Sequence, residues 1–199
     1  MVSREDDAAQ QEGAGGIELQ LLLRVAKRDE AAFATLYERI RKPVFAFIYR
    51  MVGNQALAED LLADVLFQVW ENAGQFRGES KALTWVFTIA RNRVISQLRK
   101  KGHEQLDEDK MGEIVDPAPS PSTILSDLER QKIMLGLIER LNVEHREVLL
   151  LAYYQGMSLK EMSEVLDCSE TTIKSRMFHA RTKLRWHMER LGLAKDSLL

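Results

Sequence analysis

The sequence predicts an all-α protein built from two small helical domains that a flexible, acidic, proline-containing linker joins. Apolar residues recur every three to four positions along most of the chain, which is the period of amphipathic helices. No segment shows the alternation of apolar and polar residues that is typical of a strand. Three of the four prolines fall within residues 116–122, where an extended spacer is expected rather than a helix.

These features divide the chain into five segments. Residues 1–16 are polar and glycine-rich, which predicts a disordered N-terminal tail. Residues 17–101 form the first helical domain, residues 102–122 the linker and residues 123–192 the second helical domain. Residues 193–199 are left as a C-terminal tail.

The first domain opens with a helical pattern near Ile17, and a regular apolar stripe follows from Glu30. Pro43 falls inside this stripe and should kink or divide the helix, because proline lacks the amide hydrogen that a helical bond needs. Gly53 is expected to end the helix as a C-cap residue, and Asn54 is expected to cap the next one.

Two further helices complete the first domain. One is expected over residues 55–72, and a loop over residues 72–80 follows it, since two glycines interrupt the pattern there. Ser80 is placed to cap the second helix, which should run from Lys81 to about Arg99.

The second domain is expected to hold four helices, the last two forming a helix-turn-helix. A break at Asn142 separates the first two helices. Ser158 and Glu161 form a capping box at the start of the third helix, each side chain accepting a backbone amide of the other residue. Residues 167–169 break that helix, and Ser169 is placed to cap the fourth. The fourth helix has an apolar stripe that should be buried, made of Ile173, Met177, Ala180, Leu184 and Leu191.

The opposite face of the fourth helix carries cations, short hydrogen-bond donors and one exposed aromatic residue. These residues are Thr171, Thr172, Lys174, Ser175, Phe178, His179, Arg181 and Arg185. A helix-turn-helix presents such a face to the major groove, with base edges read near the helix start and phosphates held by cations. The alternative is an ordinary amphipathic helix pair with a solvated basic face.

Charge is segregated along the chain, although the formal net charge is only −2. Residues 91–101 contain five cations and no acid, and residues 169–190 contain six cations and two acids, a net charge of +4. Residues 104–130 contain eight acids and two cations, a net charge of −6. Two basic surfaces can therefore bind nucleic acid locally, while a partner supplies much of the affinity.

Composition excludes several classes of protein. The one cysteine, Cys168, rules out an internal disulfide and a multi-cysteine zinc site. No apolar run reaches the roughly 18 residues of a membrane span, and the acidic N-terminus differs from a secretion signal, so we expect a cytoplasmic protein. The four histidines are scattered, and neither a phosphate-binding loop nor a nucleophile–base set stands out. We therefore expect no enzyme activity, metal or cofactor.

Two surfaces of the first domain remain ambiguous from residue type alone. The helix over residues 55–72 has an acidic face, which is either a solvated surface or a dock for a basic partner. The next helix places Trp85 and Asn92 seven residues apart beside a cationic stretch, an arrangement that suits base stacking on single-stranded nucleic acid. Alternatively, Trp85 is half-buried against the preceding loop.

Two blocks of sequence resemble a known family, the bacterial extracytoplasmic-function (ECF) sigma factors. The segments AEDLLADVLFQVW (58–70), FRGES (76–80) and TWVFTIARN (84–92) are similar to sigma region 2. The segments LNVEHREVLLL (141–151), GMSLKEM (156–162) and SETTIKSRMFHAR (169–181) are similar to sigma region 4. Both blocks occur in the family's order, and only the linker separates them.

The resemblance implies a promoter-specificity subunit of RNA polymerase with three binding surfaces. Core polymerase would be bound through its largest subunit by Glu59, Asp60, Asp64 and Gln68. Melted minus-10 DNA would be bound by Phe76, Arg77, Ser80, Thr84, Trp85, Arg91, Asn92, Arg93, Arg99 and Lys100. The minus-35 duplex would be read by Ser169, Thr171, Thr172, Lys174, Ser175, Arg176, Phe178, His179 and Arg181. The family often carries arginine where this chain has Lys174 and His179.

The resemblance also implies further partners. The acidic linker would thread the polymerase toward its catalytic and RNA-exit channels, bringing it to the second-largest subunit. An anti-sigma factor would occlude the polymerase and DNA faces.

A rival interpretation is a dimeric helix-turn-helix regulator that binds a palindromic duplex without polymerase. That interpretation explains residues 158–191 but leaves the acidic face and the Trp85–Asn92 pair without a role.

Overall fold

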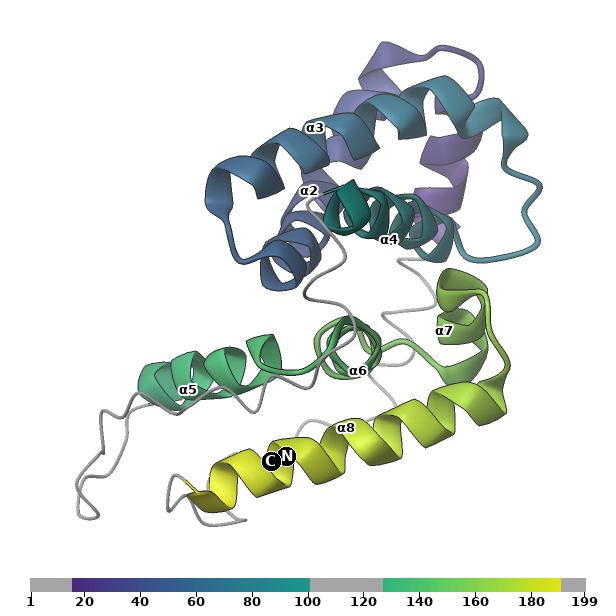
Figure 1. Cartoon of the computed structure of the whole chain (residues 1–199). Coiled ribbons are helices and arrows are strands. Elements are labelled where there is room, and N and C mark those ends of the chain that lie inside the picture. The colour runs from purple at the N-terminus through teal and green to yellow at the C-terminus, as the bar shows by residue number, and fades with distance from the viewer. Residues whose placement is uncertain (1–15, 101–126, 191–199) are drawn as a thin grey trace.

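The computed structural model describes residues 16–100 and 127–190. Within those two ranges every regular element is helical, which confirms the all-α prediction (Figure 1). A helix over residues 16–25 precedes α2 (Glu30–Val52), α3 (Gln55–Asn72), the 3-10 turn η1 (Ala73–Gln75), α4 (Ala82–Lys100), α5 (Asp127–Glu139), α6 (Val143–Leu149), the π turn η3 (Leu150–Tyr154), α7 (Leu159–Leu166) and α8 (Glu170–Arg190). Most of the predicted N-terminal tail, the linker and the C-terminal tail lie outside the described residues. None of the described helices is long and apolar enough to cross a membrane.

The helix ends of the first domain follow the capping signals in the sequence. Gly53 ends α2 in the left-handed region, at φ 65°, and its amide donates to the carbonyl of Tyr49 at 2.8 Å. The Asn54 side chain accepts from the amide of Leu57 at 2.9 Å and so caps α3. Both predicted caps are confirmed, because each depends only on residues within one turn of the chain.

In the first domain, the predicted division of the helix at Pro43 and the predicted cap at Ser80 are wrong. Pro43 does not divide α2, which runs unbroken from Glu30 to Val52. Buried Ile40 and Val44 hold the helix against the core on both sides of the proline, so packing outweighs the single missing hydrogen bond. Ser80 does not cap α4, because its hydroxyl donates to the carbonyl of Lys81 at 3.4 Å instead of accepting an amide.

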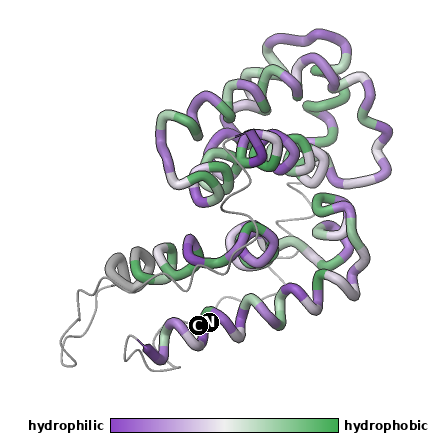
Figure 2. The backbone as a smooth tube through the Cα atoms, viewed as in Figure 1, coloured by the Kyte–Doolittle hydropathy of each residue, from purple (hydrophilic) through white to green (hydrophobic). Residues whose placement is uncertain are grey.

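The core of the first domain lies where α2, α3 and α4 cross. The rings of Phe47 and Phe87 meet edge to face at a centroid distance of 5.5 Å, and both side chains are fully buried. Along α2, α3 and α4, hydrophobic stretches recur between hydrophilic ones, as in amphipathic helices (Figure 2). Glu59 and Asp60 of α3 and Arg99 and Lys100 of α4 are exposed outside this core.

The second domain packs α6, α7 and α8 around a second group of buried residues. Asn142 caps α6 by accepting from the amide of His145 at 2.9 Å, and Ser169 accepts from the amide of Thr172 at 3.1 Å at the start of α8. The capping box of Ser158 and Glu161 is present with both hydrogen bonds. The π turn after α6 was not expected from the sequence. It buries Leu150 and Leu151 and exposes the two tyrosines that follow.

Replacing Ser158 with alanine is expected to lower the free energy of unfolding by about 1 kcal/mol, because the N-terminal amides of α7 lose their acceptor. Urea denaturation followed by circular dichroism measures this change. Ser163 is the matched control, since its hydroxyl donates to a carbonyl of its own helix and caps nothing. Equal losses for Ser158→Ala and Ser163→Ala would contradict the role of the cap.

The two domains lie against each other, with α4 placed beside α6 and α7 (Figure 1). Arg146 of α6 donates to the carbonyl of Met51 at the end of α2 at 2.8 Å. The guanidinium of Arg50 stacks over the ring of Tyr154 at 4.3 Å. The described ranges therefore form one joined body in which helices of both domains share an interface.

Candidate nucleic-acid interface

The helix-turn-helix of α7 and α8 has the geometry that the sequence predicts. Asp167 ends α7 in the left-handed region, at φ 52°, and its amide donates to the carbonyl of Ser163. Ile173, Ala180 and Leu184 of α8 are buried against the domain, as expected, and Met188 joins them. Met177, also expected in this stripe, is only half-buried. Leu191, the last residue of the predicted stripe, lies outside the described residues.

Most of the residues predicted to read minus-35 DNA lie on the outer surface of α8. Exposed side chains belong to Ser169, Thr171, Lys174, Ser175, Phe178, His179 and Arg181, and Thr172 is half-buried. Phe178 is 65% exposed, so an apolar ring lies on the open surface of α8. The surface combines donors, cations and one apolar ring, as contact with base edges and phosphates requires.

Arg176 is the exception on this helix. Its guanidinium lies toward α6, where Nη2 is 3.0 Å from Glu144 and Nη1 is 3.6 Å from Glu147. Only 21% of the side chain is exposed. The structure therefore places this residue in an ion-pair cluster within the second domain, not among the exposed residues of α8.

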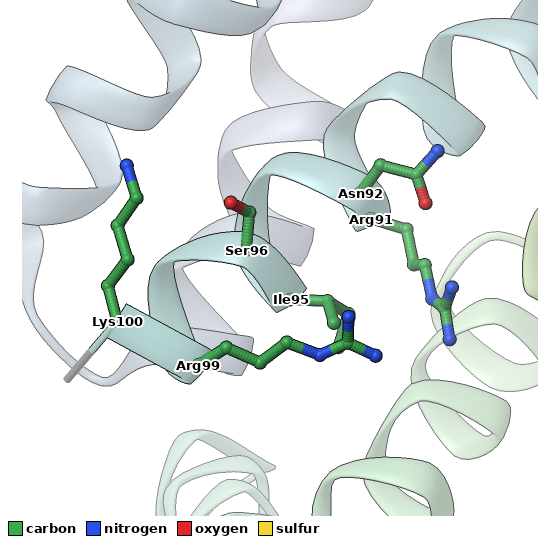
Figure 3. A pocket seen from close by; sticks show the side chains of 6 residues that line it. All are labelled: Arg91, Asn92, Ile95, Ser96, Arg99 and Lys100. Atoms are coloured by element: carbon green, nitrogen blue, oxygen red, sulfur yellow. The ribbon is translucent and has the colours of Figure 1, made fainter. Parts of the chain in front are cut away.

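The outer face of α4 forms a basic pocket of about 510 Å³ that is wide open to solvent. It is lined by Arg91, Asn92, Ile95, Ser96, Arg99 and Lys100 (Figure 3). Four of these six residues were predicted to bind minus-10 DNA, so the structure brings them together on one surface. Three cations around an uncharged amide and a hydroxyl form a surface suited to a phosphate backbone.

The aromatic part of the predicted minus-10 site is more enclosed than its cations. Trp85 is half-buried, and its ring meets that of Phe76 from the preceding loop at a centroid distance of 5.6 Å. This is the packing against the loop that the sequence left open as an alternative. Arg77 is exposed on the same loop, whereas Ser80 and Arg93 are half-buried.

Thr84 was expected on the DNA-facing side of α4, and the structure corrects this expectation. Its side chain is only 2% exposed, because the buried arc of α4 is wider than a simple stripe and includes position 84. The Thr84 carbonyl accepts from the hydroxyl of Thr88 at 3.1 Å. Thr84 therefore supports the helix from inside.

Arg91 connects the basic pocket to the second domain. Figure 3 shows its side chain extending toward the helices of that domain. Its Nε donates to Oε2 of Glu147 at 3.1 Å, and Nη2 donates to Oε1 at 3.5 Å. Burial raises the pKa of the Glu147 carboxyl, and Arg91 and Arg176 offset part of this effect. No feature of the local sequence distinguishes Glu147 from a surface acid.

The predicted polymerase-binding face lies on the outer side of α3. Glu59, Asp60 and Asp64 are exposed there, and Gln68 is half-buried. Phe67, which is absent from the predicted set, is 65% exposed beside these residues. Glu71, one turn further on, instead forms an ion pair with Arg28 at 2.8 Å. The outer side of α3 is therefore an acidic surface with one exposed aromatic ring.

No cluster of metal-binding side chains occurs in residues 16–100 or 127–190.

Comparisons with known proteins find two separate family matches along the chain. Residues 36–104 match the family described as Sigma-70 region 2, and residues 131–184 match the family described as Sigma-70, region 4. The chain is 36% identical over 183 residues to the ECF RNA polymerase sigma factor SigK of Mycolicibacterium vanbaalenii, covering 89% of this chain and 91% of that protein. It is 33% identical over 172 residues to SigK of Mycobacterium tuberculosis, and the match covers 83% of this chain and 90% of that protein.

Two solved structures have folds similar to that of this chain. The sigma factor RpoE of Bartonella quintana, solved in complex with the anti-sigma factor NepR, has a TM-score of 0.61 and 29% identity, covering 79% of this chain and 96% of that one. CnrH, solved in complex with the cytosolic domain of CnrY, shares the fold with a TM-score of 0.67 at 18% identity. The match covers 87% of this chain and 98% of that one. From both domain matches and the identity to SigK along most of its length, the chain belongs to the ECF family of RNA polymerase sigma factors, which are transcription initiation factors and not enzymes.

Proposed function

We propose that this protein binds core RNA polymerase through the outer face of α3 and directs it to promoters that α8 and α4 read in two separate parts. The observation that carries the proposal is the separation of three exposed surfaces of different character on one chain. An acidic face lies on α3, a basic pocket on α4, and a polar, cationic recognition surface on α8.

The α3 face would dock the largest polymerase subunit. Exposed Asp60 and Asp64 are one turn apart, and Phe67 follows three residues later, so all three project from nearby positions of the helix. Carboxylates around an exposed aromatic ring give both electrostatic steering and an apolar contact. The partner surface would accordingly be basic with an apolar centre.

The two DNA surfaces would act in different ways. On α8, exposed Lys174 and Arg181 would contact the minus-35 duplex, with Phe178 available for apolar contact with a base. On α4, Arg99 and Lys100 would hold phosphates of melted minus-10 DNA, and a captured base would stack on the half-buried ring of Trp85. Capture of an unpaired base in a pocket offsets the few kcal/mol that unstacking costs.

Control by an anti-sigma factor is the second part of the proposal. The related RpoE of Bartonella quintana, 29% identical, has been solved with the anti-sigma factor NepR. Exposed apolar side chains on both domains of this chain, Phe67 and Phe178, offer contacts that such a partner would cover. A protein that covers both would block polymerase docking and minus-35 reading together.

Selection of binding sequences from a random duplex library tests the proposal. Core polymerase assembled with this chain should retain DNA that carries two short elements at a fixed spacing, and core polymerase alone should retain none of it. A single palindromic element bound without core would contradict the proposal, since that result defines a dimeric helix-turn-helix regulator.

A further inference from the structure

Two consecutive tyrosines of the π turn η3 stack on arginines from different parts of the molecule. The guanidinium of Arg181, on the recognition helix α8, lies over the ring of Tyr153, with Cζ 5.6 Å from the ring centroid. The ring of Tyr154 instead lies against Arg50 of α2, at 4.3 Å. Tyr153 therefore contacts the recognition helix, although it lies outside the helix-turn-helix and outside the set of residues predicted to bind DNA.

The turn that carries Tyr153 is anchored in the core of the second domain. Leu150 and Leu151, in the same turn, are completely buried. The amide of Met157 donates to the carbonyl of Leu151 at 3.1 Å and ties down the segment that follows the turn. A tyrosine side chain has only two rotatable bonds. The ring of Tyr153, which is 52% exposed, is therefore a rigid platform at the surface.

Arg181 lies on the same face of α8 as two other residues that are proposed to contact the minus-35 duplex. Lys174, Phe178 and Arg181 are four and three residues apart, so they project from one side of the helix. All three side chains are exposed. The contact with Tyr153 therefore acts on a cation of the proposed DNA surface.

Two arginines of α8, Arg176 and Arg181, are held in different ways. Arg176 is paired with Glu144 at 3.0 Å and with Glu147 at 3.6 Å, so acids balance its charge. In the part of the chain that the structure describes, Arg181 forms no ion pair with an acid. An aromatic ring attracts and orients a guanidinium but carries no net charge. The charge of Arg181 therefore remains available to a phosphate.

We propose that Tyr153 is a positioning residue for minus-35 binding, and that its ring holds the guanidinium of Arg181 ready for a phosphate of the duplex. The DNA target rests on the function proposed above, whereas the stacking in the free chain does not. An unrestrained arginine side chain loses rotamer freedom when it binds, and a stacked one has already lost part of it. The stacking therefore raises the affinity for DNA without adding a contact to it.

The stacking itself is tested by NMR on the free full-length chain. Protons that lie over an aromatic ring resonate upfield of their usual positions, because the ring current shields them. The δ protons of Arg181, identified by their absence from Arg181→Gln, should be shifted upfield in the parent chain and in Tyr153→Phe. They should move to the usual position of an arginine in Tyr153→Leu. Signals that do not move in Tyr153→Leu would overturn the proposal.

The consequence for DNA is tested by a double-mutant cycle on the assembled holoenzyme. Fluorescence anisotropy measures the affinity for a duplex that carries the two-part element recovered by the library selection. Arg181→Gln should weaken binding about tenfold, since a charged phosphate contact is lost. Tyr153→Leu should weaken it about threefold, and Tyr153→Phe should bind like the parent because it keeps the ring. In the Arg181→Gln background, Tyr153→Leu should cause no further loss.

Trp186→Leu is the matched control for Tyr153→Leu. Trp186 is 42% exposed further along α8 and stacks with Arg190 at 4.7 Å. The substitution therefore removes a ring and a stacked arginine contact from the same helix, outside the proposed DNA surface, and should leave the duplex affinity unchanged. Thermal melting checks the fold of each variant, and Tyr153→Gln, which also lacks the ring, repeats the test if Tyr153→Leu folds poorly.

Two results of the cycle would overturn the proposal. A loss for Tyr153→Phe equal to that for Tyr153→Leu would assign the effect to the hydroxyl. An undiminished loss for Tyr153→Leu in the Arg181→Gln background would assign it to a contact other than Arg181. Failure of the proposed function would look different, because the holoenzyme selection would then recover no two-part element. The inference would lose its DNA target in that case, whatever stacking the NMR signals report.

Discussion

Reversing one charge on the outer face of α3, by Asp60→Lys, is expected to weaken binding of core polymerase about 100-fold or more. Asp60 is exposed, and Asp64 lies one turn away, so lysine would break up the acidic field of that face. Like charges brought together at an interface cost several kcal/mol, and each 1.4 kcal/mol corresponds to a tenfold change in affinity. Fluorescence anisotropy of the labelled protein, titrated with core polymerase, measures the change.

Glu189→Lys is the matched control for Asp60→Lys. Glu189 is an exposed acid near the end of α8, so the substitution changes the net charge equally on a helix of the other domain. It should leave core affinity within about threefold of the parent value, since a single distant exposed charge is largely screened. If the two variants lost affinity equally, bulk charge and not the α3 face would govern docking.

Truncation of the central aromatic residue of the first domain, Phe87→Ala, is expected to lower the free energy of unfolding by about 3–5 kcal/mol. Phe87 is fully buried on α4 and meets Phe47 of α2 edge to face at 5.5 Å. Alanine would leave a cavity where α4, which carries the basic pocket, crosses α2. Urea denaturation monitored by circular dichroism measures the loss.

Phe67→Ala provides the control for Phe87→Ala. Both substitutions remove the same atoms, but Phe67 is 65% exposed on α3. Its loss should change the free energy of unfolding by less than about 0.5 kcal/mol, as is usual for surface positions. A large loss for Phe67→Ala, or a small one for Phe87→Ala, would contradict the core described above.

Features set by a few neighbouring residues could be predicted from the sequence. The Gly53–Asn54 junction and the capping box of Ser158 and Glu161 are both present, because each is a hydrogen-bond pattern closed within one helical turn. The exposed face of α8 follows equally directly, since the spacing of its buried residues fixes which side chains point outward.

Features set by packing could not be predicted in this way. Pro43 stays inside one helix because buried residues on both sides of it hold α2 in place, and Thr84 is buried because α4 contacts neighbours over a wide arc. Arg91 and Arg176 both pair with the carboxylate of Glu147, which lies 56 residues after Arg91 and 29 residues before Arg176 in the chain. Ion pairs of that sequence separation have no local signature.

Run-off transcription with core polymerase tests the central claim most directly. The template is a duplex promoter with the selected two-part element, compared with the same promoter carrying an unpaired minus-10 bubble. The parent chain should support initiation from both templates, and Asp60→Lys should support it from neither. The double variant with Trp85→Ala and Asn92→Ala should support initiation only from the bubble template. Initiation that is unaffected by any of these changes, or that needs no added chain, would contradict the account.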